Sequence, residues 1–161
     1  MNTHVSVRSE KDLLGYRDIP NQFYFGVQTL RAIENFNLTH SKISNHPNFI
    51  IALAMVKQAC AQANHKLGKL SEEKYQAIEF ACKQLINGHY HDQFPVDMLQ
   101  GGAGTSTNMN ANEVIANVAL EHMGFAKGEY KHLHPNNDVN MSQSTNDVYP
   151  TAIRVGLLLS L

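Results

Sequence analysis

Apolar residues recur every three or four positions along two adjoining segments, which is the spacing of one face of an α-helix. The first segment lies between Pro47, which suits the first turn of a helix, and Gly68; its apolar residues are Ile50, Leu53, Val56, Cys60 and Leu67. The second lies between Ser71, a favourable N-cap, and Gly88; its apolar residues are Tyr75, Ile78, Cys82 and Leu85. The pattern predicts two helices that pack as an antiparallel hairpin, with both apolar faces in the core.

Weaker patterns predict the elements on either side of this hairpin. Residues 1–25 contain turn residues at Gly15 and Pro20, and they predict an irregular arm or a short extended strand. The other predicted elements are a short helix over residues 26–36, a short strand or extended connection over residues 93–99, and a helix over residues 105–123.

Residues 152–161 have almost no polar face, because Arg154 and Ser160 are their only polar side chains. A helix that is apolar around its circumference is normally buried on all sides. We expect its N-cap at Asn146 or Asp147, with Pro150 in its first turn. No Gly, Asn or Pro follows to end the helix, so we expect the chain to stop within the first helix of a central bundle.

Composition and charge exclude several classes of function. Of the 161 residues, 13 are Lys or Arg and 14 are Asp or Glu, so a formal net charge of −1 predicts no basic face for nucleic acid or anionic lipid. Cys60 and Cys82 have the spacing of neither a metal site nor a disulfide framework, and we expect buried thiols. Residues 1–11 contain no apolar run, which predicts neither a signal peptide nor a membrane anchor and favours a cytoplasmic location.

Three potential metal ligands, His89, His91 and Asp92, lie close together after a predicted helix end. They lack a paired ligand cluster at a known spacing, so a solvated loop is the favoured interpretation. We expect no metal and no cofactor in this segment.

Residues 100–110 (QGGAGTSTNMN) contain three glycines in four positions, followed by Thr105 and Ser106. Glycines let the backbone turn tightly and approach a ligand, and Thr105 or Ser106 is expected to cap the following helix. The free N–H groups of a helix first turn suit an anionic oxygen; the alternative is a glycine-rich turn that only starts a helix. The absence of a lysine disfavours a phosphate loop, and the absence of alternating strands and helices disfavours a dinucleotide fold.

Residues 142–147 (SQSTND) repeat this chemistry at the start of the last predicted helix. Both stretches offer hydroxyls, amides and first-turn N–H groups without Lys, Arg, His or Cys. If they converge, they could hold a carboxylate and stabilise the charge that it gains when the adjacent carbon loses a proton. Neither stretch offers a base with a tuned pKa, and the nearby acids Glu113 and Asp147 are expected to have ordinary helix-surface or capping roles.

Residues 100–114 and 142–151 resemble the first two signature regions of the aspartase/fumarase superfamily. Residues 12–15, 25–36 and 92–97 are also similar to the aspartase branch, so the resemblance extends over essentially the whole chain. Class II fumarases are expected to have Gly-Ser-Gly-Thr-Gln-Ser and Gln-Ser-Ser-Asn-Asp in the two regions. This chain has Gly-Ala-Gly-Thr-Ser and Gln-Ser-Thr-Asn-Asp, and both differences favour the aspartase branch.

The resemblance implies a mainly α fold. Residues 1–143 would form the N-terminal helical domain with a short extended or β segment, and residues 144–161 the start of a long central-bundle helix. It also implies a homotetramer without a cofactor that reversibly converts L-aspartate to fumarate and ammonia through an aci-carboxylate intermediate. By the same resemblance, the side chains of Thr105, Ser144 and Thr145 would hold the substrate carboxylate, and Asn146 would contact the amino group.

The third signature of the superfamily, which carries a serine base and a lysine, is absent from the chain. We therefore expect no catalytic residue in this segment and no activity of the segment alone. Residues 134–138 (HPNND) match a loop that forms a second carboxylate site in fumarases, but Asn137 replaces an Asp, so we expect no second site. A class II fumarase and a stand-alone ligand-binding module are the alternative interpretations.

Overall fold

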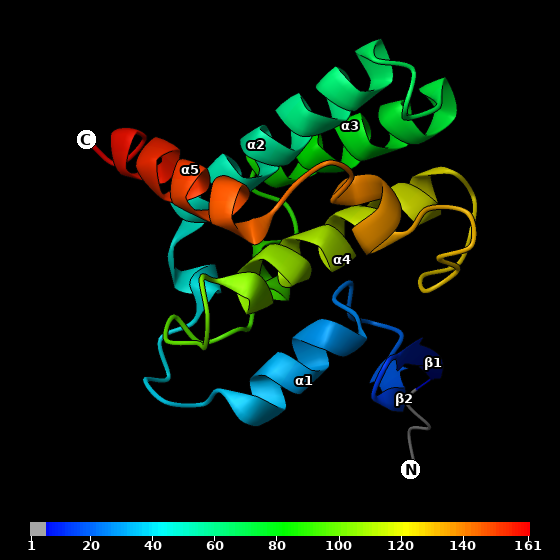
Figure 1. Ribbon diagram of the computed structural model, residues 1–161. Helices are drawn as coiled ribbons and strands as arrows, with labels where there is room; N and C mark the ends of the chain where they lie inside the picture. The colour runs from blue at the N-terminus through cyan, green and yellow to red at the C-terminus, as the bar shows by residue number, and fades with distance from the viewer. Residues whose placement is uncertain (1–5) are drawn as a thin grey trace.

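The protein folds mainly into helices with one small sheet, as the sequence predicts. The structure, a computed structural model, describes residues 6–161. Its elements are β1 (Val7–Asp12), β2 (Gly15–Pro20), α1 (Val27–Asn35), α2 (Pro47–Lys66), α3 (Glu72–Ile86), α4 (Thr105–His122) and α5 (Thr145–Leu158) (Figure 1). No helix within this part of the chain is both long and apolar enough to cross a membrane.

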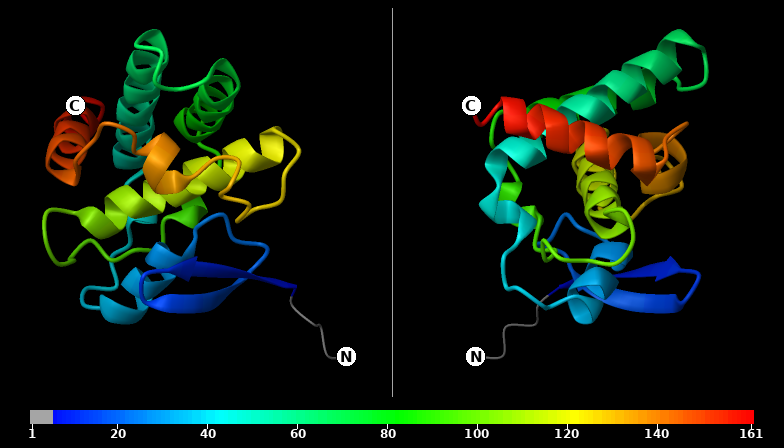
Figure 2. Two further views of the ribbon diagram at one scale, coloured as in Figure 1. Left: turned by 45° about the vertical axis from the view of Figure 1, so that its right-hand side comes forward. Right: turned by 60° about the vertical axis from the view of Figure 1, so that its left-hand side comes forward.

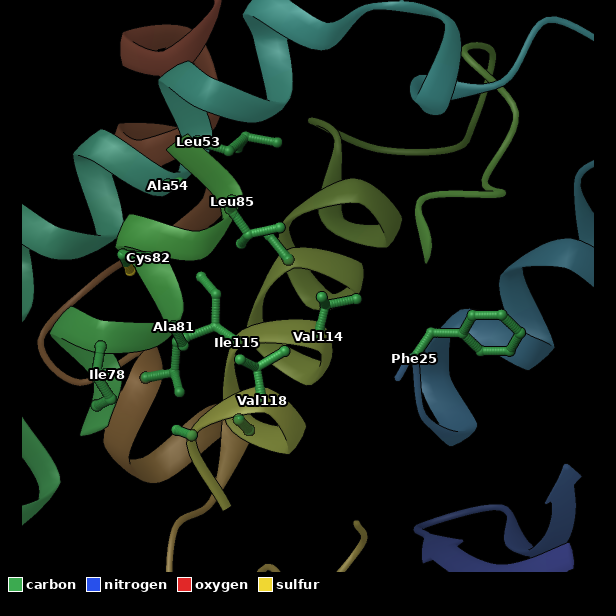
Figure 3. Close-up of a cluster of buried hydrophobic side chains, with 14 of the residues drawn as sticks. Phe25, Leu53, Ala54, Ile78, Ala81, Cys82, Leu85, Val114, Ile115 and Val118 are labelled. Carbon is green, nitrogen blue, oxygen red and sulfur yellow. The ribbon is translucent and has the colours of Figure 1, made fainter. Parts of the chain in front are cut away.

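Helix α4 is the central element of the fold. The α2–α3 hairpin lies on one side of it, and α1 with the β1–β2 hairpin lies on the other (Figures 1 and 2). Residues 107–120 of α4 are all buried, as expected for a helix covered on both sides. Ile115 and Val118 of α4 lie near Ala81 and Leu85 of α3 in the main apolar core (Figure 3).

The N-terminal segment contains two strands, where the sequence predicted an arm or one strand. Strands β1 and β2 pair antiparallel from Val7 opposite Pro20 to Asp12 opposite Gly15. Gly15 has φ of +112°, a backbone conformation that favours glycine and that ends the turn. The first five residues of the predicted arm lie outside the described part of the chain.

The predicted helical hairpin is confirmed, with corrections on the apolar face of α2. Ile50 and Leu53 are buried as expected, but Leu67 is 71% exposed, because it follows the last turn of α2 and lies beyond the core. Lys57 is fully buried instead. Of the two free thiols, Cys82 is buried and Cys60 is half-buried; burial raises the pKa of Cys82 to about 12.

The predictions for α5 are wrong in two details. Ser144 is the N-cap, and its Oγ accepts a hydrogen bond from the Asn146 N–H at 3.2 Å. The helix therefore starts before Asn146, and Pro150 lies inside it and removes the N–H that would bond the Asn146 carbonyl. Within this segment α5 is only partly covered. Ala152 and Gly156 are buried, with α2 as the principal neighbour of α5, but Leu157 is 64% exposed.

Candidate functional site

The N-terminus of α4 is built differently from the sequence prediction. Gly104, not Thr105 or Ser106, is the N-cap, and it enters the helix with φ of +88°. The acceptor for the helix N-terminus comes from Gln100, whose Oε1 accepts the Thr107 N–H at 2.9 Å. The Gln100 amide nitrogen also donates to the Thr107 hydroxyl at 2.7 Å. This pair of bonds closes the glycine-rich loop and leaves the Thr105 side chain exposed.

The two polar stretches meet where α4 and α5 begin. Gly104 lies against the ring of Tyr149, and a Cβ at this position would overlap that ring. One turn into α4, Asn108 Nδ2 donates to Thr145 Oγ1 at 3.0 Å. The convergence that the carboxylate hypothesis required is therefore present in the fold.

The four predicted site residues occupy the ends of these two helices. Thr105 is the first residue of α4, and Ser144, Thr145 and Asn146 are the N-cap and first two residues of α5. Thr145 is half-buried, whereas the other three are exposed.

An open pocket of about 350 Å³ lies between the glycine-rich loop and α5. Asn146 is the one predicted site residue that lines it; the other lining residues are Met98, Leu99, Gln100, Gly102, Ala103, Gly104, Tyr149 and Pro150. No carboxylate, amine, imidazole or thiol lines the pocket. Its polar groups can bind and orient a ligand, but they include no general base.

A buried polar network lies directly beneath Thr145. Lys57 is 0% exposed, and its Nζ donates to Asn140 Oδ1 at 2.8 Å and to Gln143 Oε1 at 2.9 Å. Asn140 Oδ1 also accepts from Asn108 Nδ2, at 3.1 Å. No carboxylate within residues 6–161 pairs with Lys57, and burial lowers its pKa to about 7.

Glu113 is buried, although the sequence suggested an ordinary surface or capping role on its own helix. It caps a different helix: its carboxylate accepts the Gly26 and Gln28 N–H groups at 2.8 Å and the Thr29 hydroxyl at 2.7 Å. Burial raises the pKa of Glu113 to about 7, against the hydrogen bonds from Thr29 that lower it. Because its oxygens are all directed to the start of α1, Glu113 joins α4 to α1 and does not face the pocket.

The other two candidate regions are used by the fold itself. His91–Gln93 form a single 3₁₀ turn in which a His91 ring nitrogen lies 2.8 Å from the Leu85 carbonyl. In residues 134–138, His134 Nδ1 accepts the Asn136 and Asn137 N–H groups that would otherwise be free for an anion. Within residues 6–161 no group of three or more His, Cys, Asp or Glu side chains is placed to hold a metal ion.

Comparison with known proteins gives the family. A family model described as "Lyase" matches residues 15–161. The chain belongs to this lyase family. It is 65% identical to an aspartate ammonia-lyase from Pseudomonas canavaninivorans over 159 residues, which cover 99% of this chain and 34% of that protein.

Two solved structures share the fold of this lyase chain. The fumarate lyase:delta crystallin from Brucella melitensis matches with a TM-score of 0.94 and 62% identity, over 95% of this chain and 34% of that one. A class II fumarase from Schistosoma mansoni matches with a TM-score of 0.89 and 36% identity, over 96% of this chain and 32% of that one. The lyase chain thus spans about a third of the length of the relatives it matches.

Sequence reasoning missed three residues that shape the site of this lyase chain: Gln100, Asn108 and Tyr149. Gln100 and Asn108 lie within the stretch that the sequence singled out; Gln100 bonds Thr107 in the same stretch, whereas the partners of Asn108 lie elsewhere. A usable signal existed for Asn108, because α4 contains four asparagines among its apolar residues, and an asparagine that is buried needs hydrogen-bond partners. No comparable signal marks Tyr149, whose contact with Gly104 arises only from the packing of α5 on α4.

Proposed function

We propose that the chain is the N-terminal part of an aspartate ammonia-lyase, which reversibly converts L-aspartate to fumarate and ammonia. The observation that carries the proposal is the meeting of the α4 and α5 N-termini, which join through the hydrogen bond between Asn108 and Thr145. The 65% identity to an aspartate ammonia-lyase supports the choice of reaction. On this proposal residues 1–143 form the N-terminal domain, and residues 144–161 begin the central bundle of a cytoplasmic homotetramer.

In the proposed reaction a base removes a proton from Cβ of L-aspartate, and the electron pair moves into the adjacent carboxylate to give an aci-carboxylate. The C–N bond then breaks, the double bond of fumarate forms, and ammonia leaves with the electron pair of that bond. The carboxylate gains negative charge in the first step, so donors directed at it stabilise the transition state more than the ground state.

The proposal gives each predicted site residue one part in this chemistry. Hydroxyls of Thr105, Ser144 and Thr145 donate to the carboxylate whose charge grows, aided by the positive ends of the α4 and α5 dipoles. The Asn146 side chain contacts the substrate amino group. Because the four predicted site residues offer only hydroxyl and amide groups, the proposal assigns the general base to the part of the protein outside this segment.

A class II fumarase is the second candidate, because one of the structural neighbours is such an enzyme. Its 36% identity is well below the 65% to the aspartate ammonia-lyase, so the substrate amino group is favoured over a hydroxyl.

The test is an assay of the full-length protein that carries this segment, with L-aspartate and L-malate as alternative substrates and fumarate formation as the readout. We expect turnover of L-aspartate with release of one ammonia per fumarate, and no turnover of L-malate. Turnover of L-malate alone would replace the proposal by a fumarase. The 161-residue chain assayed with L-aspartate is expected to form no fumarate.

A further inference from the structure

The hydroxyl of Thr145 is held by a partner that can only donate to it. A threonine hydroxyl has one proton to donate and two lone pairs that accept. Asn108 Nδ2 donates to Thr145 Oγ1 at 3.0 Å, so the oxygen accepts in this bond and the hydroxyl proton is directed elsewhere. Thr145 makes no second side-chain hydrogen bond within residues 6–161, so this proton is free for a ligand.

Lys57 fixes which end of the Asn108 amide faces Thr145. Its Nζ donates to Asn140 Oδ1, while Asn140 Nδ2 donates to the Gln143 carbonyl at 3.1 Å, so the Asn140 oxygen faces inward. That oxygen lies 3.1 Å from the Asn108 side chain, which must present its nitrogen there. A reversed Asn108 amide would place its oxygen against the Asn140 oxygen, leaving two acceptors without a proton between them.

The orientation of Asn108 has a cost. Asn108 is 1% exposed, and its Oδ1 has no hydrogen-bond partner within the described residues. A buried amide oxygen without a partner is destabilising. Asn110 and Asn112 on the same helix also leave Oδ1 without a partner within the described residues, so the orientation of Asn108 rests on its bonds to Thr145 and Asn140.

We propose that Asn108 is a positioning residue for substrate binding: it donates to Thr145 Oγ1 and so directs the Thr145 proton toward the substrate carboxylate, while Lys57 and Asn140 hold Asn108 in the required orientation. The inference rests on the proposed function, because it assigns the Thr145 hydroxyl to the substrate. It adds a chain of buried hydrogen bonds that runs from Lys57 through Asn140 and Asn108 to Thr145. Of these four residues, only Thr145 touches the ligand.

The test is a double-mutant cycle on kcat/KM for L-aspartate in the full-length protein, with Thr145→Val, Asn108→Asp and the double variant. Asn108→Asp keeps the size of the side chain but replaces the donor by an acceptor, so the Thr145 proton turns inward to the new carboxylate. We expect Asn108→Asp to lower kcat/KM by about 10- to 100-fold, mainly through kcat, since the lost interaction strengthens in the transition state. The double variant is expected to be no more than about 3-fold worse than Thr145→Val alone.

Asn117→Ala is the matched control for the loss of a buried amide on the same helix. Asn117 is also fully buried in α4, but its Nδ2 donates to the Tyr24 carbonyl at 2.7 Å, away from the site. We expect this variant to lower the melting temperature and to leave kcat/KM within about 2-fold of the unmodified protein. Asn108→Ala provides a second variant that removes the donor without adding charge.

The outcomes separate the inference from the proposed function. The positioning role is overturned if Thr145→Val lowers kcat/KM while Asn108→Asp and Asn108→Ala do not. It is also overturned if the reductions in kcat/KM of the two single variants multiply in the double variant. In both cases the proposed function stands. If Thr145→Val leaves kcat/KM for L-aspartate unchanged, the hydroxyl is not part of the site. The positioning role of Asn108 and the part assigned to Thr145 then both fail, while the conversion of L-aspartate stands. If Asn117→Ala lowers kcat/KM as much as Asn108→Asp does, the role of Asn108 is in folding and not in positioning Thr145.

Discussion

Replacing Lys57 by Met should remove a large pH dependence from the stability of the protein. Lys57 is fully buried without a carboxylate partner, and burial lowers its pKa from 10.5 to about 7. In the unfolded chain the same amine keeps its proton until about pH 10.5. Between these two values the unfolded state binds more protons than the folded state, so the free energy of unfolding rises with pH.

The size of the effect follows from the two pKa values. Integrating the difference in bound protons from pH 6.5 to pH 8.5, with a folded pKa of about 7, gives an increase of about 2 kcal/mol in the free energy of unfolding. This window lies below the pH range in which Cys82 affects stability. Burial raises the pKa of the Cys82 thiol to about 12, so this thiol makes the free energy of unfolding fall with pH only above its ordinary pKa of 9. The Lys57→Met variant lacks the titrating amine and should lack this increase.

The assay is urea unfolding at half-unit steps between pH 6.5 and pH 8.5, followed by circular dichroism. Subtracting the curve of Lys57→Met from that of the unmodified protein cancels the other titrating groups. Lys66→Met, which changes an exposed lysine at the end of the same helix, should leave the pH dependence intact. If the free energy of unfolding varies with pH in the same way in the unmodified protein and in Lys57→Met, the reasoning is refuted. Lys57 would then have the same pKa in the folded and the unfolded state.

Three further substitutions test the interactions that hold the fold together. Leu85→Ala removes a side chain that is 1% exposed, and urea unfolding should show a loss of about 2–5 kcal/mol; a loss below about 1 kcal/mol would contradict its core position. Gly26→Ala places a Cβ 2.5 Å from Glu10 Oε2, so a lowered melting temperature is expected. An unchanged melting temperature would show that the Glu10 side chain can move away from the added methyl group. The hydrogen bond from Thr39 holds the pKa of Asp97 well below its ordinary 3.8, so its contribution is present above pH 4 and lost on acidification. Asp97→Asn should therefore reduce the fall in the free energy of unfolding below pH 4. An unaltered fall would show that ionised Asp97 does not stabilise the fold.

The α2–α3 hairpin could be predicted from the sequence because each of its helices has its own apolar spacing and local end signals. Ser71 illustrates this, since its Oγ accepts the Lys74 N–H at 3.4 Å at the predicted start of α3. The residues that form the start of α4 were harder to predict from the sequence. Gly104 takes the N-cap of α4 because its positive φ suits the tight turn, and its acceptor comes from Gln100, four residues earlier.

Buried polar residues account for most of what the sequence could not predict. Lys57 lies on the apolar face of α2, four residues after Leu53, although a lysine is normally exposed. Lys57 and Glu113 are both buried because amides and backbone N–H groups from distant segments surround them. Helix periodicity says which face is apolar, but it does not identify partners that are far apart in the chain. The convergence of α4 and α5 is of this kind, because it depends on the route of residues 123–144 between them.

The central claim is that the ends of α4 and α5 hold the substrate carboxylate, and Thr105→Val in the full-length protein tests it most directly. Thr105 is exposed, and its side chain makes no hydrogen bond within residues 6–161, so an isosteric valine should leave the melting temperature unchanged. Removing one donor from a site of developing charge costs about 10²- to 10³-fold in rate. We predict a loss of that order in kcat/KM for L-aspartate, whereas retention of the full kcat/KM would contradict the carboxylate-binding account.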